Sequence, residues 1–222
     1  MLRYKVVEKF ISINGEGRLA GELAVFIRFQ GCNLACSYCD TTWANQEEAP
    51  YELMTAEELY SYIKETKVCN ITLTGGEPLL NPKMDVLLRL LGEDQSLNIE
   101  IETNGSVDLA PFAKLERPPV FTMDYKLPSS LMEADMMISN FDVLGTKDTV
   151  KFVVGDFRDL ERAREIIRGH QLISKCQVYL STVFGKISLD EVVTYMKTHK
   201  MNGVRLQLQM HKVIWDPNLR GV

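Results

Sequence analysis

The sequence predicts an α/β fold in which parallel strands alternate with helices to form a sheet or a barrel. Seven short segments rich in β-branched and aromatic residues recur along the chain, and helical patterns fill several of the gaps between them. Polar or glycine-rich peptides follow the first four of these strands. Because strands that alternate with helices pair in parallel, we expect β-α units with right-handed crossovers.

The order of elements follows from local patterns. The predicted strands are Val25–Phe29, Asn70–Thr74, Asn98–Thr103, Val120–Tyr125, Thr149–Val154, Gln177–Thr182 and Val204–Gln209. The clearest helix begins at Thr55, because Thr55-Ala56-Glu57-Glu58 has the pattern of a capping box. Further helices are predicted at Met84–Leu91, Leu160–Arg168, which starts from Asp156 or Asp159, and Leu189–Lys200. The gaps at 110–119 and 128–140 lack clear helical patterns, so we expect shortened crossovers there.

Length and composition predict one compact domain over residues 1–222, with 45% hydrophobic and 25% charged residues. The net charge of -5 and the lack of a basic stripe argue against a nucleic-acid partner. No apolar run reaches the length of a bilayer, and the start of the chain lacks the pattern of a secretion signal. We therefore expect a cytoplasmic protein without a membrane partner.

Three of the five cysteines, Cys32, Cys36 and Cys39, crowd into one short peptide. Their Cys-x3-Cys-x2-Cys spacing indicates an iron–sulfur centre with one iron left open, since three thiolates are one short of the usual four. A structural zinc site is one alternative, but it needs a fourth ligand from a distant cysteine or histidine. A thioredoxin-like pair at Cys36 and Cys39 is another. We expect Cys69 and Cys176 to be small buried residues.

The polar peptides share one position relative to the strands. In parallel β/α folds the carboxyl ends of the strands carry the active site, so these peptides should meet at one rim. They are Cys32–Thr41 after the first strand, Gly75-Gly76-Glu77-Pro78 after the second, Glu102-Thr103-Asn104-Gly105 at the end of the third and Asp124-Tyr125-Lys126 at the end of the fourth.

The cysteine run and the Gly-Gly-Glu-Pro peptide resemble the radical S-adenosylmethionine (SAM) superfamily. Further motifs narrow the resemblance to the 7-carboxy-7-deazaguanine synthase family, and it extends along the whole chain. These motifs are Ser12-Ile13-Asn14-Gly15-Glu16-Gly17, Phe26-Ile27-Arg28-Phe29, Cys39-Asp40-Thr41 and the segment from Trp215 to Arg220-Gly221-Val222.

The resemblance implies a partial (β/α)6 TIM-like barrel with some reduced crossover helices. It also implies a lyase of queuosine and other 7-deazapurine biosynthesis. That enzyme contracts the ring of 6-carboxy-5,6,7,8-tetrahydropterin to 7-carboxy-7-deazaguanine, with loss of ammonia. The reaction starts with hydrogen abstraction by a 5′-deoxyadenosyl radical, which the cofactors generate.

The resemblance implies three cofactors. A [4Fe-4S] cluster is expected on Cys32, Cys36 and Cys39, with SAM on its open iron, and Mg²⁺ on Thr41, where the ion would keep several waters. For a threonine after Cys-Asp, a turn or cap role is the alternative. Residues implied in SAM binding are Tyr38, Cys39, Asp40, Gly76, Asp124, Tyr125 and Lys126. Many relatives have Ser-Pro-Lys where this chain has Asp124-Tyr125-Lys126, and Gly75-Gly76 has a plain turn as its alternative.

Substrate contacts are also implied by the resemblance, at Ile13, Asn14, Gly15, Arg28, Thr74, His211 and Val222. Arg28 interrupts an apolar strand and needs a partner, which a substrate carboxylate would supply. An ion pair with Glu16 is the alternative. Asn14-Gly15 is also a strong turn signal, and a lone histidine or a chain terminus is often structural.

The resemblance further implies a homodimer and a reducing electron donor such as flavodoxin or ferredoxin. Two other functions stay open on the sequence. One is a different radical SAM enzyme, such as a glycyl-radical activase. The other is a non-catalytic iron–sulfur or zinc module, although an electron carrier would ligate every iron with protein side chains.

Overall fold

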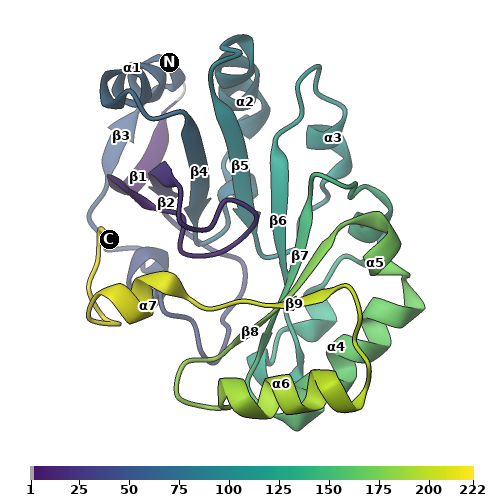
Figure 1. Cartoon of the computed structure of the whole chain (residues 1–222). Coiled ribbons are helices and arrows are strands. Elements are labelled where there is room, and N and C mark those ends of the chain that lie inside the picture. The colour runs from purple at the N-terminus through teal and green to yellow at the C-terminus, as the bar shows by residue number, and fades with distance from the viewer. Residues whose placement is uncertain (1–2) are drawn as a thin grey trace.

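The computed structural model describes residues 3–222, which contain one curved sheet with helices against its outer side (Figure 1). The strand order is β3-β1-β2-β4-β5-β6-β7-β8-β9. The strands are β1 Tyr4–Ile13, β2 Leu23–Phe29, β3 Glu52–Met54, β4 Asn70–Gly75, β5 Asn98–Thr103, β6 Val120–Tyr125, β7 Thr149–Val154, β8 Gln177–Thr182 and β9 Val204–Leu206. The helices are α1 Ala56–Thr66, α2 Met84–Glu93, α3 Ala110–Ala113, α4 Phe157–Gly169, α5 Leu172–Lys175, α6 Leu189–Thr198 and α7 Met210–Ile214.

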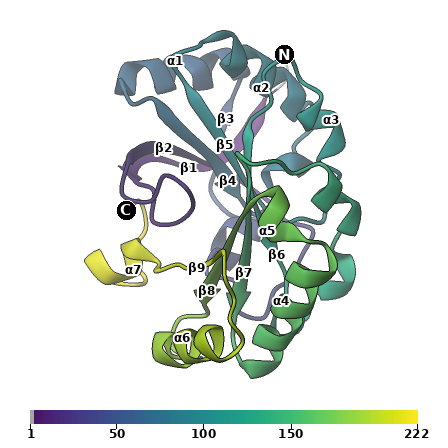
Figure 2. The same ribbon diagram turned by 45° about the vertical axis from the view of Figure 1, so that its right-hand side comes forward.

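The strands from β2 through β9 in the sheet order all pair in parallel. Strands β1 and β3 extend one edge of the sheet in the antiparallel sense. The sheet is curved, and its concave side, the hollow, carries the loop between β1 and β2, with α7 at the open side of the sheet (Figures 1 and 2). The predicted partial barrel is therefore confirmed, and the antiparallel edge leaves it open.

Local sequence signals fix where the helices begin. Thr55 is the N-cap of α1, and a complete capping box joins it to Glu58. Asp156 caps α4 by accepting a hydrogen bond from the Asp159 N–H. The predicted shortening of two crossovers is confirmed, because α3 has four residues and three 3₁₀ turns occupy much of the segment from Pro128 to Asp142.

The two faces of the parallel strands differ in chemistry. Because successive side chains point to opposite faces, every second residue faces the helices. On that outer face Ile27, Leu73, Ile101, Phe152 and Leu180 are fully buried and belong to one hydrophobic core. The residues between them face the hollow, and many of those are polar or charged. The apolar core therefore lies between the sheet and the helices.

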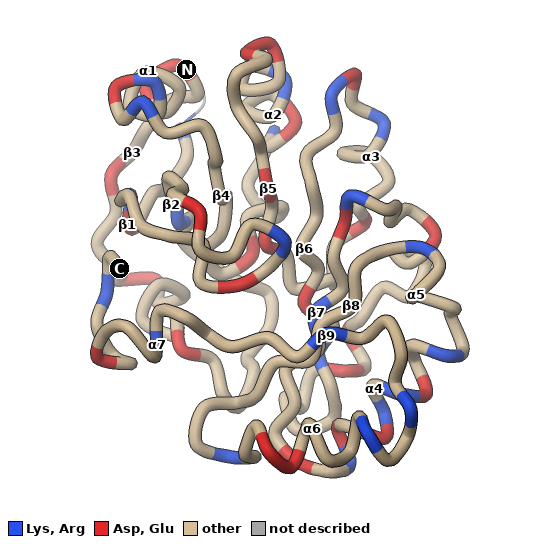
Figure 3. The backbone as a smooth tube through the Cα atoms, viewed as in Figure 1, with Lys and Arg blue, Asp and Glu red and all other residues tan. Residues whose placement is uncertain are grey.

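Some expectations need correction. The antiparallel strands β1 and β3 were not among the predicted strands, and β9 ends at Leu206 rather than at Gln209. Cys176 is buried, but Cys69 is exposed, because it precedes β4 at the amino-terminal edge of the sheet. Lys and Arg alternate with Asp and Glu over the surface helices in the view of Figure 3. Among residues 3–222 no helix has the length and apolar character needed to cross a membrane.

Candidate active site

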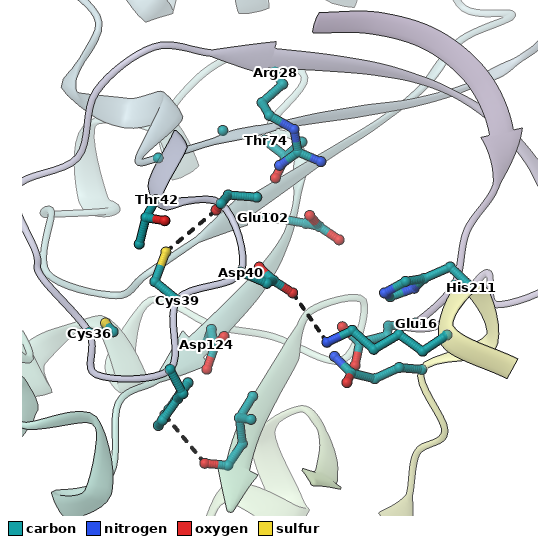
Figure 4. Close-up of a pocket in the computed structure, with 18 of the residues that line it drawn as sticks. Glu16, Arg28, Cys36, Cys39, Asp40, Thr42, Thr74, Glu102, Asp124 and His211 are labelled. Atoms are coloured by element: carbon teal, nitrogen blue, oxygen red, sulfur yellow. Dashed lines mark hydrogen bonds and ion pairs between the residues drawn. The ribbon is translucent and has the colours of Figure 1, made fainter. Parts of the chain in front are cut away.

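A cavity of about 610 Å³ lies at the carboxyl ends of the parallel strands. The peptides that follow β2, β4, β5 and β6 all contribute to its walls, as the sequence predicted. Figure 4 shows Cys36 and Cys39 at one end, Glu16 and His211 at the other, and Arg28 between them on the side of β2. Predicted site residues that line the cavity are Ile13, Gly15, Arg28, Cys32, Cys36, Tyr38, Cys39, Asp40, Thr41, Thr74, Gly76, Asp124, Lys126, His211 and Val222.

The three cysteines of the loop after β2 are free thiols that line the cavity. The Leu34 N–H donates to Cys32 Sγ at 3.4 Å, and the Asn45 side-chain amide lies 3.9 Å from Cys39 Sγ. Burial raises the pKa of the Cys36 thiol, whereas Lys126 lowers it. Amide donors and a nearby cation are what thiolate ligands of a cluster need, so this set fits a cluster with one open iron.

A closed zinc site finds no support in the geometry. A structural zinc ion needs four nitrogen or sulfur ligands around one point. Within residues 3–222 no three His, Cys, Asp or Glu side chains are arranged to hold a single metal ion. In a cubane, by contrast, each cysteine binds a different iron, so the sulfurs stand apart.

Gly75 and Gly76 bring the end of β4 against the start of the cysteine loop. Gly75 has a φ of +147°, and a Cβ there would overlap the backbone of Phe29. A Cβ on Gly76 would overlap the Gly31 carbonyl and the Asn45 side chain. The glycines are therefore required for packing between two backbone segments, which favours the plain turn, and Gly76 also lines the cavity.

Four partly buried charged side chains form a network across the middle of the cavity. Lys126 Nζ lies 2.9 Å and Lys151 Nζ 3.7 Å from Asp124 Oδ2, and Lys151 Nζ lies 2.8 Å from Glu16 Oε2. Burial raises the pKa of Asp124, but the two lysines outweigh it and hold that pKa below its usual value. Burial likewise lowers the pKa of Lys151, but Glu16 and Asp124 hold it well above the usual range. Asp124 and the two lysines are therefore charged near neutral pH.

Asp124 has an unsatisfied atom in this network. Its Oδ1 is buried and accepts no hydrogen bond from the described residues. A buried acceptor without a donor is costly, so the position fits a ligand that carries hydroxyl or ammonium groups. The ribose and the amino group of SAM are donors of that kind.

Arg28 pairs with Glu8, not with Glu16. Arg28 Nε donates to Glu8 Oε2 at 3.0 Å, and the two residues are opposite each other in the β1–β2 pairing. The predicted alternative of an Arg28–Glu16 pair is therefore wrong, because Glu16 lies in the loop beyond β1 and binds Lys151 and Ser181 instead. Arg28 still faces the cavity, with Thr74 beside it on β4. Its remaining guanidinium nitrogens have no protein partner among the hydrogen bonds of the described residues.

The carboxyl-terminal segment forms the open wall of the cavity. The Met210 N–H donates to the Gly15 carbonyl, and His211 packs so closely on Gly15 that a Cβ there would overlap its ring. Burial lowers the pKa of His211, which keeps the ring neutral near pH 7. Farther along, the Arg220 guanidinium lies 4.0 Å from the centre of the Trp43 ring. This contact brings the last residues, with Val222, against the cavity.

Thr41 and Asp40 occupy the turn that ends the cysteine loop. Thr41 Oγ1 lies 3.6 Å from Cys39 Sγ, and Asp40 Oδ2 lies 3.3 Å from Lys212 Nζ. The Thr41 backbone carbonyl also accepts the Ala44 N–H, as in the predicted turn. A hydroxyl facing a roomy polar cavity is compatible with a magnesium ion that keeps most of its waters.

Two predicted site residues do not line the cavity. The Asn14 side chain is buried in the sheet, where its Oδ1 accepts a hydrogen bond from Thr72 Oγ1 at 2.9 Å. Tyr125 follows Asp124 in β6, so the strand alternation turns its ring outward. That ring packs on Phe141 and Phe152 in the core. Both are corrections to the expected side-chain contacts.

Sequence reasoning missed the partners of the charged residues. Glu8 and Lys151 line the cavity and neutralise Arg28 and Glu16, yet neither belongs to a motif. Lys151 is 135 positions from Glu16 in the chain. The only local signal was a charged residue inside an otherwise apolar strand, since Lys151 stands in Val150-Lys151-Phe152.

The parallel sheet, the open side and the cysteine loop together define a protein of the radical SAM class. Residues 26–196, more than half of the chain, match the family model of the radical SAM superfamily. The chain is 57% identical to the 7-carboxy-7-deazaguanine synthase of Clostridium acetobutylicum over 221 residues, covering 100% of both chains. It is 33% identical to the one of Leptospira interrogans over 242 residues, covering 100% of this chain and 99% of the other. The chain belongs to the 7-carboxy-7-deazaguanine synthase family.

A solved structure supports the fold independently. The crystal structure of QueE from Escherichia coli superposes with a TM-score of 0.65 at 22% sequence identity. The match covers 93% of this chain and 93% of the other. The partial barrel is thus shared although most residues differ.

Proposed function

We propose that this protein converts 6-carboxy-5,6,7,8-tetrahydropterin to 7-carboxy-7-deazaguanine and ammonia, in the biosynthesis of queuosine and related 7-deazapurines. One observation supports this above the others. A single cavity joins three free cysteines to a partly buried arginine whose remaining guanidinium nitrogens have no hydrogen-bond partner among the described residues. The cysteines suit a radical-generating cluster, and the arginine suits a carboxylate-bearing substrate.

At the cysteine end, Cys32, Cys36 and Cys39 would hold a [4Fe-4S] cluster. Together with SAM, the cluster supplies the 5′-deoxyadenosyl radical that takes hydrogen from the substrate. Asp124 Oδ1 would accept a hydrogen bond from SAM, and Lys126 keeps that carboxylate ionised. Tyr38, Asp40 and Gly76 complete the proposed SAM contacts, with Tyr125 acting only through the backbone or the core.

At the other end, Arg28 would bind the substrate carboxylate through the guanidinium nitrogens that Glu8 leaves free. Ile13, Gly15, Thr74, His211 and Val222 would contact the pterin ring, and Asn14 would hold the loop that carries Gly15. Neutral His211 can donate one hydrogen bond and accept another. The carboxyl-terminal segment would exclude water, which protects a reactive intermediate.

Other parts of the proposal concern partners and location. We infer a Mg²⁺ ion at Thr41, whose remaining ligands are waters and substrate oxygens. We also infer an electron donor such as flavodoxin or ferredoxin, a homodimer, a cytoplasmic location and a single domain over residues 1–222. The acidic surface and free cysteines are compatible with these inferences.

Product identification tests the proposal. The protein is reconstituted with iron and sulfide without oxygen, reduced, and incubated with SAM and the carboxy-tetrahydropterin. Mass spectrometry should detect 7-carboxy-7-deazaguanine, with one ammonia for each product molecule. A parallel incubation with a glycyl-radical enzyme tests the activase alternative. Formation of 5′-deoxyadenosine without the deazaguanine would reject this substrate but not the radical chemistry.

A further inference from the structure

Asn104, which follows β5, aims its side-chain amide at a cysteine of the loop. Asn104 Nδ2 donates to Cys32 Sγ at 3.5 Å and to Asn33 Oδ1 at 3.1 Å. On the other side, Asn104 Oδ1 accepts from the Ser106 N–H at 2.9 Å and from Ser106 Oγ at 2.6 Å. Because two donors hold the oxygen, the nitrogen has to face the sulfur, and the amide orientation is fixed.

Glu77 fixes the backbone from which this amide projects. The carboxylate is fully buried between the peptide after β4 and the end of β5. Its Oε2 accepts from the Asn104 N–H at 2.6 Å and from Thr103 Oγ1 at 2.9 Å. Its Oε1 accepts from the Leu79 N–H at 3.0 Å. A buried carboxyl group is costly, so three donors on one group indicate a rigid junction between the two strand ends.

The hydrogen bond from Asn104 to Cys32 Sγ would affect how easily the cluster is reduced. Hydrogen bonds to a ligating sulfur stabilise negative charge on it, and the reduced cluster carries one more negative charge than the oxidised one. A donor on Cys32 Sγ therefore favours reduction. The Leu34 N–H also donates to this sulfur, so Cys32 Sγ receives hydrogen bonds from two amide donors.

We propose that Asn104 raises the reduction potential of the cluster by donating to Cys32 Sγ, and that Glu77 is the positioning residue that holds Asn104 in place. The Gly-Gly-Glu-Pro peptide would then act on the electron-transfer step as well as on packing. This inference rests on the cluster of the proposed function but does not depend on the pterin reaction.

The test is a redox titration of the reconstituted protein in which electron paramagnetic resonance measures the fraction of reduced cluster. Asn104→Ala removes the amide that donates to Cys32 Sγ. Asn104→Asp also removes this donor and adds a negative charge, but it keeps an oxygen that accepts the hydrogen bonds from Ser106. Both variants should reduce the equilibrium constant for one-electron reduction by about tenfold or more, which is about 59 mV toward negative potential. Ser106→Ala is the matched control, because it removes one hydroxyl donor to the Asn104 oxygen but no donor to sulfur. The backbone N–H of residue 106 still holds that oxygen, so the potential should stay at the wild-type value.

Glu77→Gln keeps the test decisive if the Asn104 variants do not take up iron. Gln can no longer accept at both oxygens, so Asn104 should lose its position and the potential should fall by a smaller amount. Potentials equal to the wild-type value in Asn104→Ala, or in Glu77→Gln where the former has no cluster, would overturn the inference. A wild-type protein that takes up no cluster at all would instead contradict the proposed function.

Discussion

Lys151 and Phe152 are neighbours in β7, yet they belong to two different regions of the molecule. Lys151 faces the hollow and joins a partly buried network of four charges. Phe152 faces the helices and is fully buried among apolar side chains. The outer face of the sheet stabilises the fold, whereas the inner face consists largely of groups that cost free energy to bury. A folded protein retains such a face when the face carries out chemistry.

Loss of one cysteine should have the largest effect. Cys36→Ala leaves two thiolates, too few to hold the cluster, so bound iron and product formation should fall to background. Unfolding by urea should change little, because Cys36 lies in a loop at the cavity. The control is Cys69→Ala, an exposed cysteine outside the cavity, which should keep its iron. Full activity in Cys36→Ala would show that the reaction does not need the cysteine loop.

On the outer face, Phe152→Ala should reduce the free energy of unfolding by about 3–5 kcal/mol. The cause is a cavity in the core where the ring packs on Tyr125. Urea unfolding measures the change. Phe157→Ala is the control, since Phe157 is exposed on α4 and its loss should cost little. If the folded Phe152→Ala variant lost its iron as Cys36→Ala does, the outer face would be needed for cluster binding as well as for stability.

A buried acid of the inner face should make stability depend on pH. Burial raises the pKa of Glu100 to about 7, so the folded state keeps a proton that the unfolded chain releases above its usual pKa of 4.5. Wild-type stability should therefore fall between pH 4.5 and pH 7. Glu100→Gln removes this loss. At pH 8 its free energy of unfolding should exceed that of the wild type by on the order of 3 kcal/mol. Urea unfolding from pH 5 to pH 8 measures it.

The matched control for that profile is Glu116→Gln, at an exposed position. It should leave the pH dependence unchanged. A Glu100→Gln profile parallel to that of the wild type would show that Glu100 is already ionised in the folded protein.

Removal of the Arg28 guanidinium tests the substrate end. Arg28→Met leaves Glu8 without its partner and the substrate carboxylate without its clamp, so kcat/KM for the pterin should fall by about 30-fold or more. Most of the change should be in KM, because the contact exists before the reaction. Glu8→Gln keeps Arg28 and should have a smaller effect. An unchanged KM in Arg28→Met would assign Arg28 to structure alone.

The smallest expected effect is at the carboxyl-terminal wall. Arg220→Gln removes the contact with Trp43 and should raise the KM for the pterin about twofold to fivefold. Steady-state kinetics measure it. Arg205 lies over Tyr179 outside the cavity, so Arg205→Gln should leave KM unchanged. An equal rise in KM in both variants would mean that the change comes from a loss of overall stability and not from the carboxyl-terminal wall.

The outer face was far easier to predict from the sequence than the inner face. Each predicted parallel strand is rich in β-branched and aromatic residues, and a capping box marks Thr55 as the start of a helix. Strand β1 was missed because Lys5, Glu8 and Lys9 interrupt its pattern, and the edge strand β3 because it has only three residues. Edge strands face solvent on one side, so their apolar signal is weak.

The site was predictable where its residues belong to contiguous motifs. The cysteine loop and the peptides after β4 to β6 all meet at the cavity, because parallel strands end at one rim. The exceptions are Asn14, whose side chain is hydrogen-bonded to Thr72, and Tyr125, whose ring the strand alternation turns into the core. Glu8 and Lys151 were missed because their partners come from distant segments, which a single sequence does not connect.

Electron paramagnetic resonance with and without SAM shows most directly whether the inner face holds a cluster with an open iron. The wild-type protein is reconstituted without oxygen and reduced, and its electron paramagnetic resonance spectrum is recorded before and after SAM is added. The wild-type protein should give a [4Fe-4S] signal that is absent in Cys36→Ala and that changes when SAM binds the open iron. A signal that SAM leaves unchanged, or iron retained in full by Cys36→Ala, would contradict it.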